Sequence, residues 1–347
     1  TVEIQVTNNN GTDNGATRQV YIDKRKPVVK LSGVENGTHY RRNQNVITDV
    51  EDVSFKNTRT QYYVTRTLDG RTYKEKADAY MMRKYKDQCT RQFRKEGRYQ
   101  IYAITTDSAG NQTKSNTLRF VIDKTAPKIA IAGTSDGSMN GTDVSLQFDL
   151  TDSFYQTVRS VIKIERTLDG NTTSSEETAF PKKGKHSTWN HTFSEDGTYT
   201  VTFTATDKAG NKAKTQKITF SVDKTQPVIR ITGTTNFEQW DKSVTVRFAV
   251  EESYYAGNRI VIQGTRQDIN GEVEELDLPA ITNSAKVSSL LQTFKQDGIY
   301  NVTVTARDEA GNQDKQEIHF TLDQTRPEIH KVKQYQSGYY QEFRIAD

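Results

Sequence analysis

Two short motifs recur along this chain at a fixed long spacing, and that repetition limits its fold more than any other feature. A turn of the form Asp-x-Ala-Gly-Asn begins at Asp107, Asp207 and Asp308. Each turn precedes a segment that ends in Asp-x-x-x-Pro. The aspartates of these junctions lie 100 residues apart, at Asp23, Asp123, Asp223 and Asp323. A fixed long period indicates a tandem array of similar modules.

The period also predicts the domain boundaries. About 100 residues is a common size for one domain, so the 347 residues accommodate three whole modules, at 24–123, 124–223 and 224–323. Residues 1–23 then correspond to the C-terminal hairpin of a truncated preceding repeat, and residues 324–347 to the first strands of a truncated following one. We therefore expect the sequence to be a segment of a longer protein.

Hydrophobic residues alternate with polar residues within each module. In the second module Val144, Leu146, Phe148 and Leu150 alternate in this way, which is the period of a half-buried strand. We find no segment with convincing helical periodicity. Short alternating strands joined by hairpin turns, about seven in each hundred residues, predict a β-sandwich. The mean hydropathy of −0.82 suits small sandwiches with one wet face per sheet.

The strand before the turn carries a further motif. The segment Asp196-Gly197-Thr198-Tyr199 resembles the tyrosine corner of immunoglobulin domains. Together with the two recurring motifs, it makes residues 24–323 resemble the bacterial Ig-like domains of Gram-positive cell-surface proteins. The resemblance implies an all-β fold of tandem Ig-like β-sandwiches in an extended array, located outside the cell, either on the bacterial surface or secreted. The first module departs from the pattern, because its second and third strands are less regular and more charged.

We interpret the recurring motifs first as structural. Glycine permits a left-handed turn, Asp and Asn side chains satisfy turn amides, and proline stiffens the link between modules. The predicted structural hairpin and linker residues are Asp107, Gly110, Asn111, Asp123, Pro127, Asp207, Gly210, Asn211, Asp223, Pro227, Asp308, Gly311 and Asn312. On this interpretation the chain needs no metal or other cofactor.

The alternative interpretation is calcium bound between the modules, since calcium prefers oxygen ligands. The second module could gather Asp123, Asp152, Asp207 and Asn211 at its N-terminal end. One repeat later the corresponding set is Asp223, Glu251, Glu252, Asp308 and Asn312. The Lys or Gln that directly follows each linker aspartate argues against this interpretation.

Aromatic side chains occupy the loop after the second strand, in Ser153-Phe154-Tyr155 and Ser253-Tyr254-Tyr255. Aromatic residues at the end of a module most often pack against the next module. We therefore predict packing between modules, and the alternative is contact with the face of a sugar.

Charge is divided unevenly among the modules. Residues 24–123 contain 21 Lys and Arg against 11 Asp and Glu, a net charge of +10, whereas residues 224–323 contain 10 against 15, a net charge of −5. Basic residues mixed with tyrosines suit an anionic polymer, so the first module carries a candidate anion-binding surface. Its members are Arg59, Arg66, Arg71, Lys74, Arg83 and Lys84. The alternative is a solvated charged face, and no motif for specific nucleic-acid recognition accompanies these residues.

Catalysis has little support in the sequence. The five histidines show no spacing typical of a metal site or a catalytic triad, and a single cysteine, Cys89, cannot form an internal disulfide. No apolar run approaches the length of a membrane span.

We predict a non-enzymatic spacer or stalk that takes part in adhesion. Its partners would be adjacent Ig-like repeats, with host or cell-wall glycan or protein as a further partner. The alternatives are an adhesin that binds an anionic glycan or host protein through the basic first module, or accessory modules of a secreted glycan-active enzyme or a phage tail protein.

Overall fold

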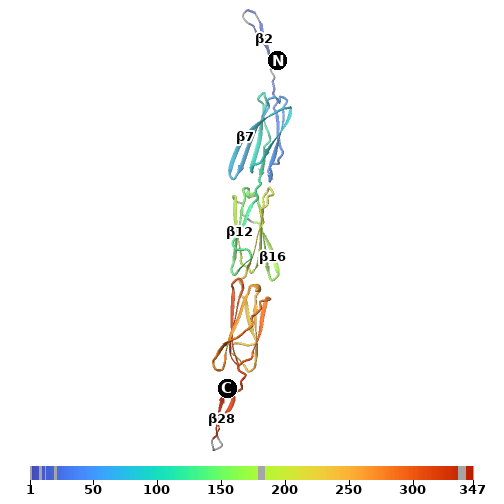
Figure 1. The fold of residues 1–347 in the computed structure, drawn as a ribbon. Helices are drawn as coiled ribbons and strands as arrows, with labels where there is room; N and C mark the ends of the chain where they lie inside the picture. The colour runs from blue at the N-terminus through green and yellow to red at the C-terminus, as the bar shows by residue number, and fades with distance from the viewer. Residues whose placement is uncertain are drawn as a thin grey trace.

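Three β-sandwiches lie end to end along one axis in the computed structural model, with a two-stranded hairpin beyond each end (Figure 1). The structure describes residues 2–7, 10–11, 13–18, 22–178, 184–334 and 341–346. The outer hairpins are formed by β1 (Val2–Thr7) with β2 (Asp13–Arg18) and by β28 (Glu328–Gln334) with β29 (Gln341–Ala346). The helical segments of the described residues are two 3-10 turns, η1 (Tyr155–Thr157) and η2 (Tyr255–Gly257). The prediction of an all-β tandem array is confirmed.

The first sandwich consists of a smaller and a larger sheet. The smaller sheet contains, in spatial order, β3 (Val28–Ser32), β5 (Gln44–Glu51) and β8 (Lys86–Phe93). The larger sheet contains β4 (His39–Tyr40), β11 (Leu118–Ile122), β9 (Gly97–Thr106), β6 (Arg59–Leu68) and β7 (Arg71–Met81), with β10 (Gln112–Lys114) paired to β9.

The second and third sandwiches repeat this topology. The smaller sheets contain β12 (Lys128–Ala132), β14 (Val144–Thr151) and β17 (His186–Phe193), then β20 (Val228–Thr232), β22 (Val244–Glu251) and β25 (Val287–Phe294). The larger sheet of the second sandwich contains β13 (Ser138–Asn140), β19 (Gln216–Val222), β18 (Gly197–Thr206), β15 (Arg159–Leu168) and β16 (Asn171–Glu177). That of the third contains β21 (Glu238–Trp240), β27 (Gln313–Leu322), β26 (Gly298–Arg307), β23 (Arg259–Gln267) and β24 (Val273–Glu275).

Each sandwich has its own hydrophobic core between the two sheets. In the second sandwich Phe148 comes from the smaller sheet and Phe203 from the larger, and both side chains are fully buried. The tyrosine-corner motif forms in all three sandwiches: the hydroxyls of Tyr99, Tyr199 and Tyr300 each donate to a backbone carbonyl four residues upstream, at 2.7, 2.7 and 2.6 Å. This bond closes the turn that leads into the strand carrying the tyrosine.

Candidate functional site

The Asp-x-Ala-Gly-Asn segment forms a closed turn beside the linker that enters each sandwich. In the second sandwich the backbone amide of Asp207 donates to the backbone carbonyl of Asn211 at 3.1 Å. The backbone amide of Asn211 donates to the Asp207 carboxylate at 2.8 Å. Gly210 has a φ of +88°, a left-handed conformation that glycine adopts without a steric cost. The same bonds recur at the turns that begin at Asp107 and Asp308.

The asparagine of each turn fastens the linker to the sandwich. The side-chain amides of Asn111, Asn211 and Asn312 donate to the backbone carbonyls of Asp23, Asp123 and Asp223, at 3.0, 2.9 and 2.8 Å. Each amide also donates to the carboxylate of the aspartate that begins its own turn. The structure therefore brings the predicted hairpin and linker residues together at all three junctions.

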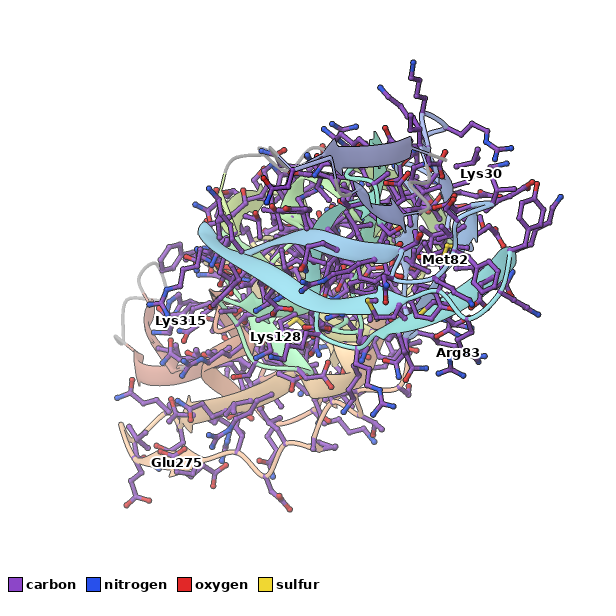
Figure 2. All side chains as sticks on the ribbon, turned by 90° about the horizontal axis from the view of Figure 1, so that it is seen from above. Lys30, Met82, Arg83, Lys128, Glu275 and Lys315 are labelled. Atoms are coloured by element: carbon purple, nitrogen blue, oxygen red, sulfur yellow. The ribbon has the colours of Figure 1, made fainter. Side chains whose placement is uncertain are left out.

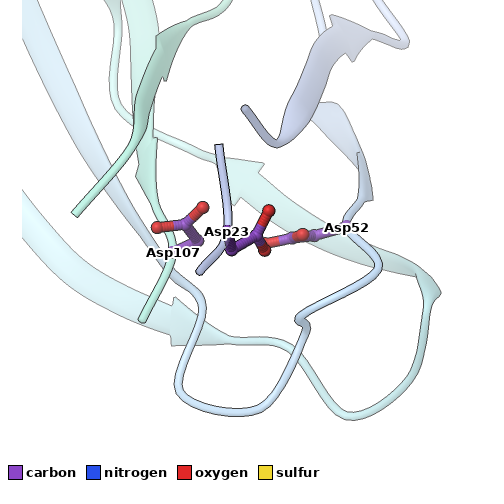
Figure 3. Close-up of side chains that lie close together, drawn as sticks. All are labelled: Asp23, Asp52 and Asp107. Carbon is purple, nitrogen blue, oxygen red and sulfur yellow. The ribbon is translucent and has the colours of Figure 1, made fainter. Parts of the chain in front are cut away.

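A third acidic residue, from the loop after the second main strand, joins the two aspartates at each junction. We call each set a junction trio. The trios are Asp23, Asp52 and Asp107; Asp123, Asp152 and Asp207; and Asp223, Glu252 and Asp308. In the first trio, one carboxylate oxygen from each residue lies within 4.8 Å of the other two (Figure 3).

Two of these trios were predicted from the sequence, and the first was not, although Asp52 precedes Asp152 by one period. One predicted member, Glu251, lies elsewhere: its carboxylate is 4.0 Å from Arg230 on the neighbouring strand. Asn211 and Asn312 were predicted as oxygen ligands. In the structure their side-chain amide nitrogens instead donate hydrogen bonds to the linker carbonyls.

The second and third trios are almost completely buried. Asp123 and Asp223 are each 1% exposed, and the Oδ2 atom of each has no hydrogen-bond partner in the described part of the chain. Burial, followed by the charges of Asp207 and Asp152, raises the pKa of Asp123 to about 7. Burial, followed by the charges of Glu252 and Asp308, raises the pKa of Asp223 to about 7. Burial and like charges therefore make both carboxylates harder to ionise than a solvated aspartate.

The first trio is more open. The Asp23 side chain is 13% exposed, and its carboxylate lies 3.9 Å from the Arg25 guanidinium. Hydrogen bonds from the Ser54 side chain and the Arg25 amide lower the pKa of Asp23 below its ordinary value. The three junctions thus share one arrangement of residues but differ in electrostatic environment.

A second set of acidic residues, which the sequence analysis missed, fastens the linker from the preceding sandwich. The Asp196 carboxylate accepts the Lys224 amide at 2.9 Å and also accepts the Thr225 hydroxyl. Glu96 and Asp297 make the same two contacts with their own linkers. We call Glu96, Asp196 and Asp297 the linker clamps. The sequence signal was available, because each clamp stands directly before the glycine of the tyrosine-corner turn.

The side chains that follow the linker aspartates point away from the trios. The Lys124 ammonium donates to the Arg94 carbonyl at 2.6 Å, and the Lys224 ammonium pairs with Asp143 at 3.0 Å. Gln324 donates to the Lys295 carbonyl. The linker cations that argued against metal binding in the sequence therefore do not neutralise these carboxylates.

Neighbouring sandwiches also contact each other directly. Lys185 pairs with Asp69 at 2.7 Å, and Lys286 pairs with Asp169 at 3.3 Å one period later. The Phe154 ring, 3% exposed, lies 5.2 Å from the Arg98 guanidinium and 6.2 Å from the His39 ring of the preceding sandwich. This position agrees with the expectation that the loop aromatics pack between modules. Tyr155 instead belongs to the core of its own sandwich.

The candidate anion-binding residues of the first sandwich do not share one face. Arg66 points to the core side, where its guanidinium donates to the Glu96 carbonyl at 2.8 Å and stacks on Tyr73 at 4.1 Å. Arg166 and Arg266 make the same carbonyl contact in the other sandwiches.

The other candidate residues lie in several places. Arg59 and Lys74 lie on the outer face of the larger sheet, whereas Arg71 follows the β6–β7 turn. Arg83 and Lys84 lie in the loop after β7, where Arg83 projects at the rim of the sandwich (Figure 2).

Comparison with known proteins agrees with this architecture. Two family models, both described as bacterial Ig-like domains, match residues 125–224 and 183–326. No curated protein matches the chain in sequence. None of the described helices is long and apolar enough to cross a membrane.

Solved structures of other repeat arrays are similar in fold. A tetra-tandem repeat from the extending region of a large adhesion protein is 19% identical, with 93% of this chain and 81% of that chain covered and a TM-score of 0.50. The Escherichia coli adhesin FdeC is 10% identical, with 88% and 100% covered and a TM-score of 0.36. The first of these supports a shared tandem-sandwich fold. With the family matches and the repeated junctions, it shows that the chain is built from bacterial Ig-like domain repeats.

Proposed function

We propose that the chain is an extracellular spacer of a bacterial surface protein, which holds other parts of that protein away from the cell. The observation that carries this proposal is that both links between sandwiches are fastened in the same way. In each of these links, the carbonyl of the linker aspartate accepts the side-chain amide of the turn asparagine in the following sandwich. The next backbone amide and the threonine hydroxyl of the linker donate to the clamp of the preceding sandwich. Each linker is thus bonded on both sides, and the link resists bending.

Proline adds to this stiffness. Pro127 and Pro227 are buried where each linker ends, and a proline ring fixes φ near −65°. The array therefore has short, packed links instead of flexible ones. Its immediate partners are the adjacent repeats of the same chain, and its reach from the cell grows with each added repeat.

Negative-stain electron microscopy of the full chain tests the spacer function. We expect straight rods with a narrow distribution of angles at both junctions. A broad distribution of angles would show that the links are hinges, and the proposal would then be wrong.

A second function, adhesion through the first sandwich, is favoured by one surface feature. Tyr63 and Tyr102 stack on the outer face of the larger sheet, with ring centroids 5.0 Å apart and planes inclined by 7°, and the Lys114 ammonium lies 4.2 Å from the Tyr102 ring. Lys163 and Thr202 occupy the corresponding positions of the second sandwich, which therefore has no such pair. Stacked aromatic rings beside basic residues suit an anionic glycan.

Heparin, an anionic polysaccharide, is a suitable probe for this surface. We expect the chain to elute from a heparin column at higher salt than a Lys114→Ala, Tyr102→Ala double variant. Lys217→Ala, which removes one positive charge from the second sandwich, controls for net charge. Equal elution of the double variant and the control would exclude this surface as the binding site.

Bacterial Ig-like domains and adhesin repeats are typically non-catalytic, and we assign the array no enzymatic step. Service as accessory modules of a secreted glycan-active enzyme or a phage tail protein is also compatible with a spacer. In both cases the mechanical role of the junctions is the same.

A further inference from the structure

We propose that the third sandwich binds a neutral glycan through the exposed ring of Phe237, which stacks against the apolar face of one sugar unit. Phe237 lies in the loop between β20 and β21, and its side chain is 80% exposed. Its ring stacks on the imidazole of His319, with ring centroids 5.7 Å apart and planes inclined by 10°. The site is separate from the basic surface of the first sandwich and does not rest on the spacer function.

The loop that carries Phe237 has the same hydrogen bonds in all three sandwiches. In the third sandwich the Phe237 amide donates to the His319 carbonyl at 2.6 Å, and the His319 amide donates to the Asn236 side chain at 2.9 Å. The amides of Gly37 and Gly137 make the corresponding backbone bond at 2.8 and 2.7 Å. The third loop therefore carries a phenylalanine where the other two carry glycine.

Phenylalanine is an unfavourable residue for this backbone conformation. The φ angles of Gly37, Gly137 and Phe237 are +80°, +78° and +62°, in the left-handed region that glycine adopts without a steric cost. A bulky side chain strains the backbone there, and such strain is concentrated at functional sites. Because the Phe237 side chain is mostly exposed, packing within the sandwich offsets little of this cost. A ligand that contacts the ring gives the phenylalanine a role that folding does not.

The second ring of the stack is held in place by the sheet. Ile318 and Phe320 are buried in the core, so His319 between them faces outward from the larger sheet. Asn301 stands opposite His319 on the neighbouring strand, and its side chain shares a hydrogen bond with the Nδ1 atom of the imidazole. The imidazole therefore supports one face of the Phe237 ring and leaves the other face to a ligand.

The surroundings of the stack favour a neutral sugar. Residues 224–323 carry a net charge of −5, which repels an anionic polymer. Thr303 and Glu317 stand opposite each other on the same outer face, next along the two strands from Asn301 and His319. Their hydroxyl and carboxylate oxygens can accept hydrogen bonds from sugar hydroxyls. The C–H groups on one face of a pyranose ring pack against the negative face of an aromatic ring.

Saturation-transfer difference nuclear magnetic resonance of the full chain tests this binding. The probes are three neutral disaccharides: lactose, cellobiose and N,N′-diacetylchitobiose. At about 10 mM probe, a concentration suited to millimolar affinity, we expect transfer from the protein to the C–H protons on one face of a sugar ring in at least one probe. Phe237→Gly, which introduces the residue of the other two loops, should abolish this transfer.

Ile269→Gly is the matched control. The Ile269 side chain is 81% exposed on the same sandwich, so this variant removes an equally exposed apolar group and leaves the stacked rings in place. Its transfer should equal that of the wild type. Thermal unfolding checks the fold of Phe237→Gly, which we expect to melt at the wild-type temperature or higher because glycine removes the strain.

A second variant tests the site without changing the loop. His319→Thr introduces the residue found at the corresponding position of the second sandwich, Thr219, and removes the supporting ring. We expect it to reduce the transfer, and it decides the question if Phe237→Gly melts lower than the wild type.

Three results would overturn the proposal. The first is the absence of transfer to all three probes, and the second is wild-type transfer in both Phe237→Gly and His319→Thr. The third is a wild-type dimer in analytical ultracentrifugation that Phe237→Gly abolishes, without sugar transfer, because the ring would then join two copies of the chain. The spacer function does not depend on any of these outcomes.

Discussion

Single side chains at the junctions each connect several segments of the chain. The Asn211 amide donates at once to the Asp123 carbonyl and to the Asp207 carboxylate. Neither aspartic acid nor alanine could make both bonds, since the first lacks the donor and the second lacks any polar group. An asparagine at this position therefore couples the turn to the linker.

Asn211→Ala should lower the free energy of unfolding of the second sandwich by about 1–3 kcal/mol, because it leaves part-buried acceptors without their donor. Calorimetric melting of the full chain measures this change. Asn270→Ala is the control: Asn270 lies in an exposed turn, and among the described residues its side chain bonds to Asp268 alone, so a change within about 0.5 kcal/mol is expected. Equal losses in the two variants would contradict the coupling role of Asn211.

His39 gives the contact between the first and second sandwiches a dependence on pH. Burial against Phe154, followed by the positive charges of Lys208 and Arg98, lowers its pKa to about 4, while Asp207 acts in the opposite direction. A separated His39 would titrate near 6.5. The docked arrangement holds the neutral ring, so docking is fully favourable above pH 6.5. The contribution of His39 to docking decreases as the pH falls from about 6.5 to 4, and below about pH 4 this contribution is fully lost.

Nuclear magnetic resonance of the full chain measures this titration directly. The imidazole C2 proton of His39 should remain in its neutral position at pH 5.5, and His39→Gln identifies the signal by removing it. A midpoint near 6.5 would show that the ring is not buried between the sandwiches.

Some residue roles follow from the sequence and others do not. The turn residues Asp207, Gly210 and Asn211 were predictable, because each satisfies a local backbone requirement. The clamp role of Asp196 depends on a linker 28 residues away. The sequence around Arg166 does not distinguish it from a surface arginine, although its guanidinium donates to the Asp196 carbonyl. Such roles depend on tertiary contacts that a local pattern does not encode.

At the level of elements, the linkers behave as short structured segments fixed at both ends. Asp196→Ala would remove the acceptor for the Lys224 amide and the Thr225 hydroxyl. We expect the Lys224 amide to exchange its hydrogen at least about tenfold faster, equivalent to about 1.4 kcal/mol of lost protection. Hydrogen exchange followed by nuclear magnetic resonance measures this rate.

Glu195→Ala is the matched control for the clamp. The Glu195 side chain is 73% exposed, and its partner in the described part of the chain is Arg166, so its removal should leave Lys224 exchange unchanged. Similar acceleration in both variants would mean that the clamp does not hold the linker.

The strands were the most predictable elements, because alternating residues such as Val144 and Leu146 face one core. The less regular first sandwich was predicted less well. Its Tyr62 and Tyr63 are adjacent, and only the structure shows that Tyr62 lies in the core while Tyr63 stacks outside on Tyr102. Adjacent residues of a strand point to opposite faces of the sheet, so proximity in the sequence does not group side chains on one surface.

At the scale of the whole molecule, the three sandwiches lie end to end (Figure 1), and we expect the two similarly bonded links to keep them in line as one rod. With strands of eight to ten residues at about 3.3 Å per residue, together with end loops, the three sandwiches span on the order of 120 Å. The domain boundaries and the basic binding surface remain predictions, whereas the tandem Ig-like fold is established.

Small-angle X-ray scattering of the full chain in solution tests the stiffness of the array most directly. The hydrogen-bonded junctions predict the pair-distance distribution of a rod, with a long linear tail that extends to at least about 120 Å. The tail should persist between about 0.05 and 0.5 M salt, since salt screens exposed charges but leaves packed linkers in place. A short, bell-shaped distribution, or a tail that shortens with salt, would contradict a stiff spacer.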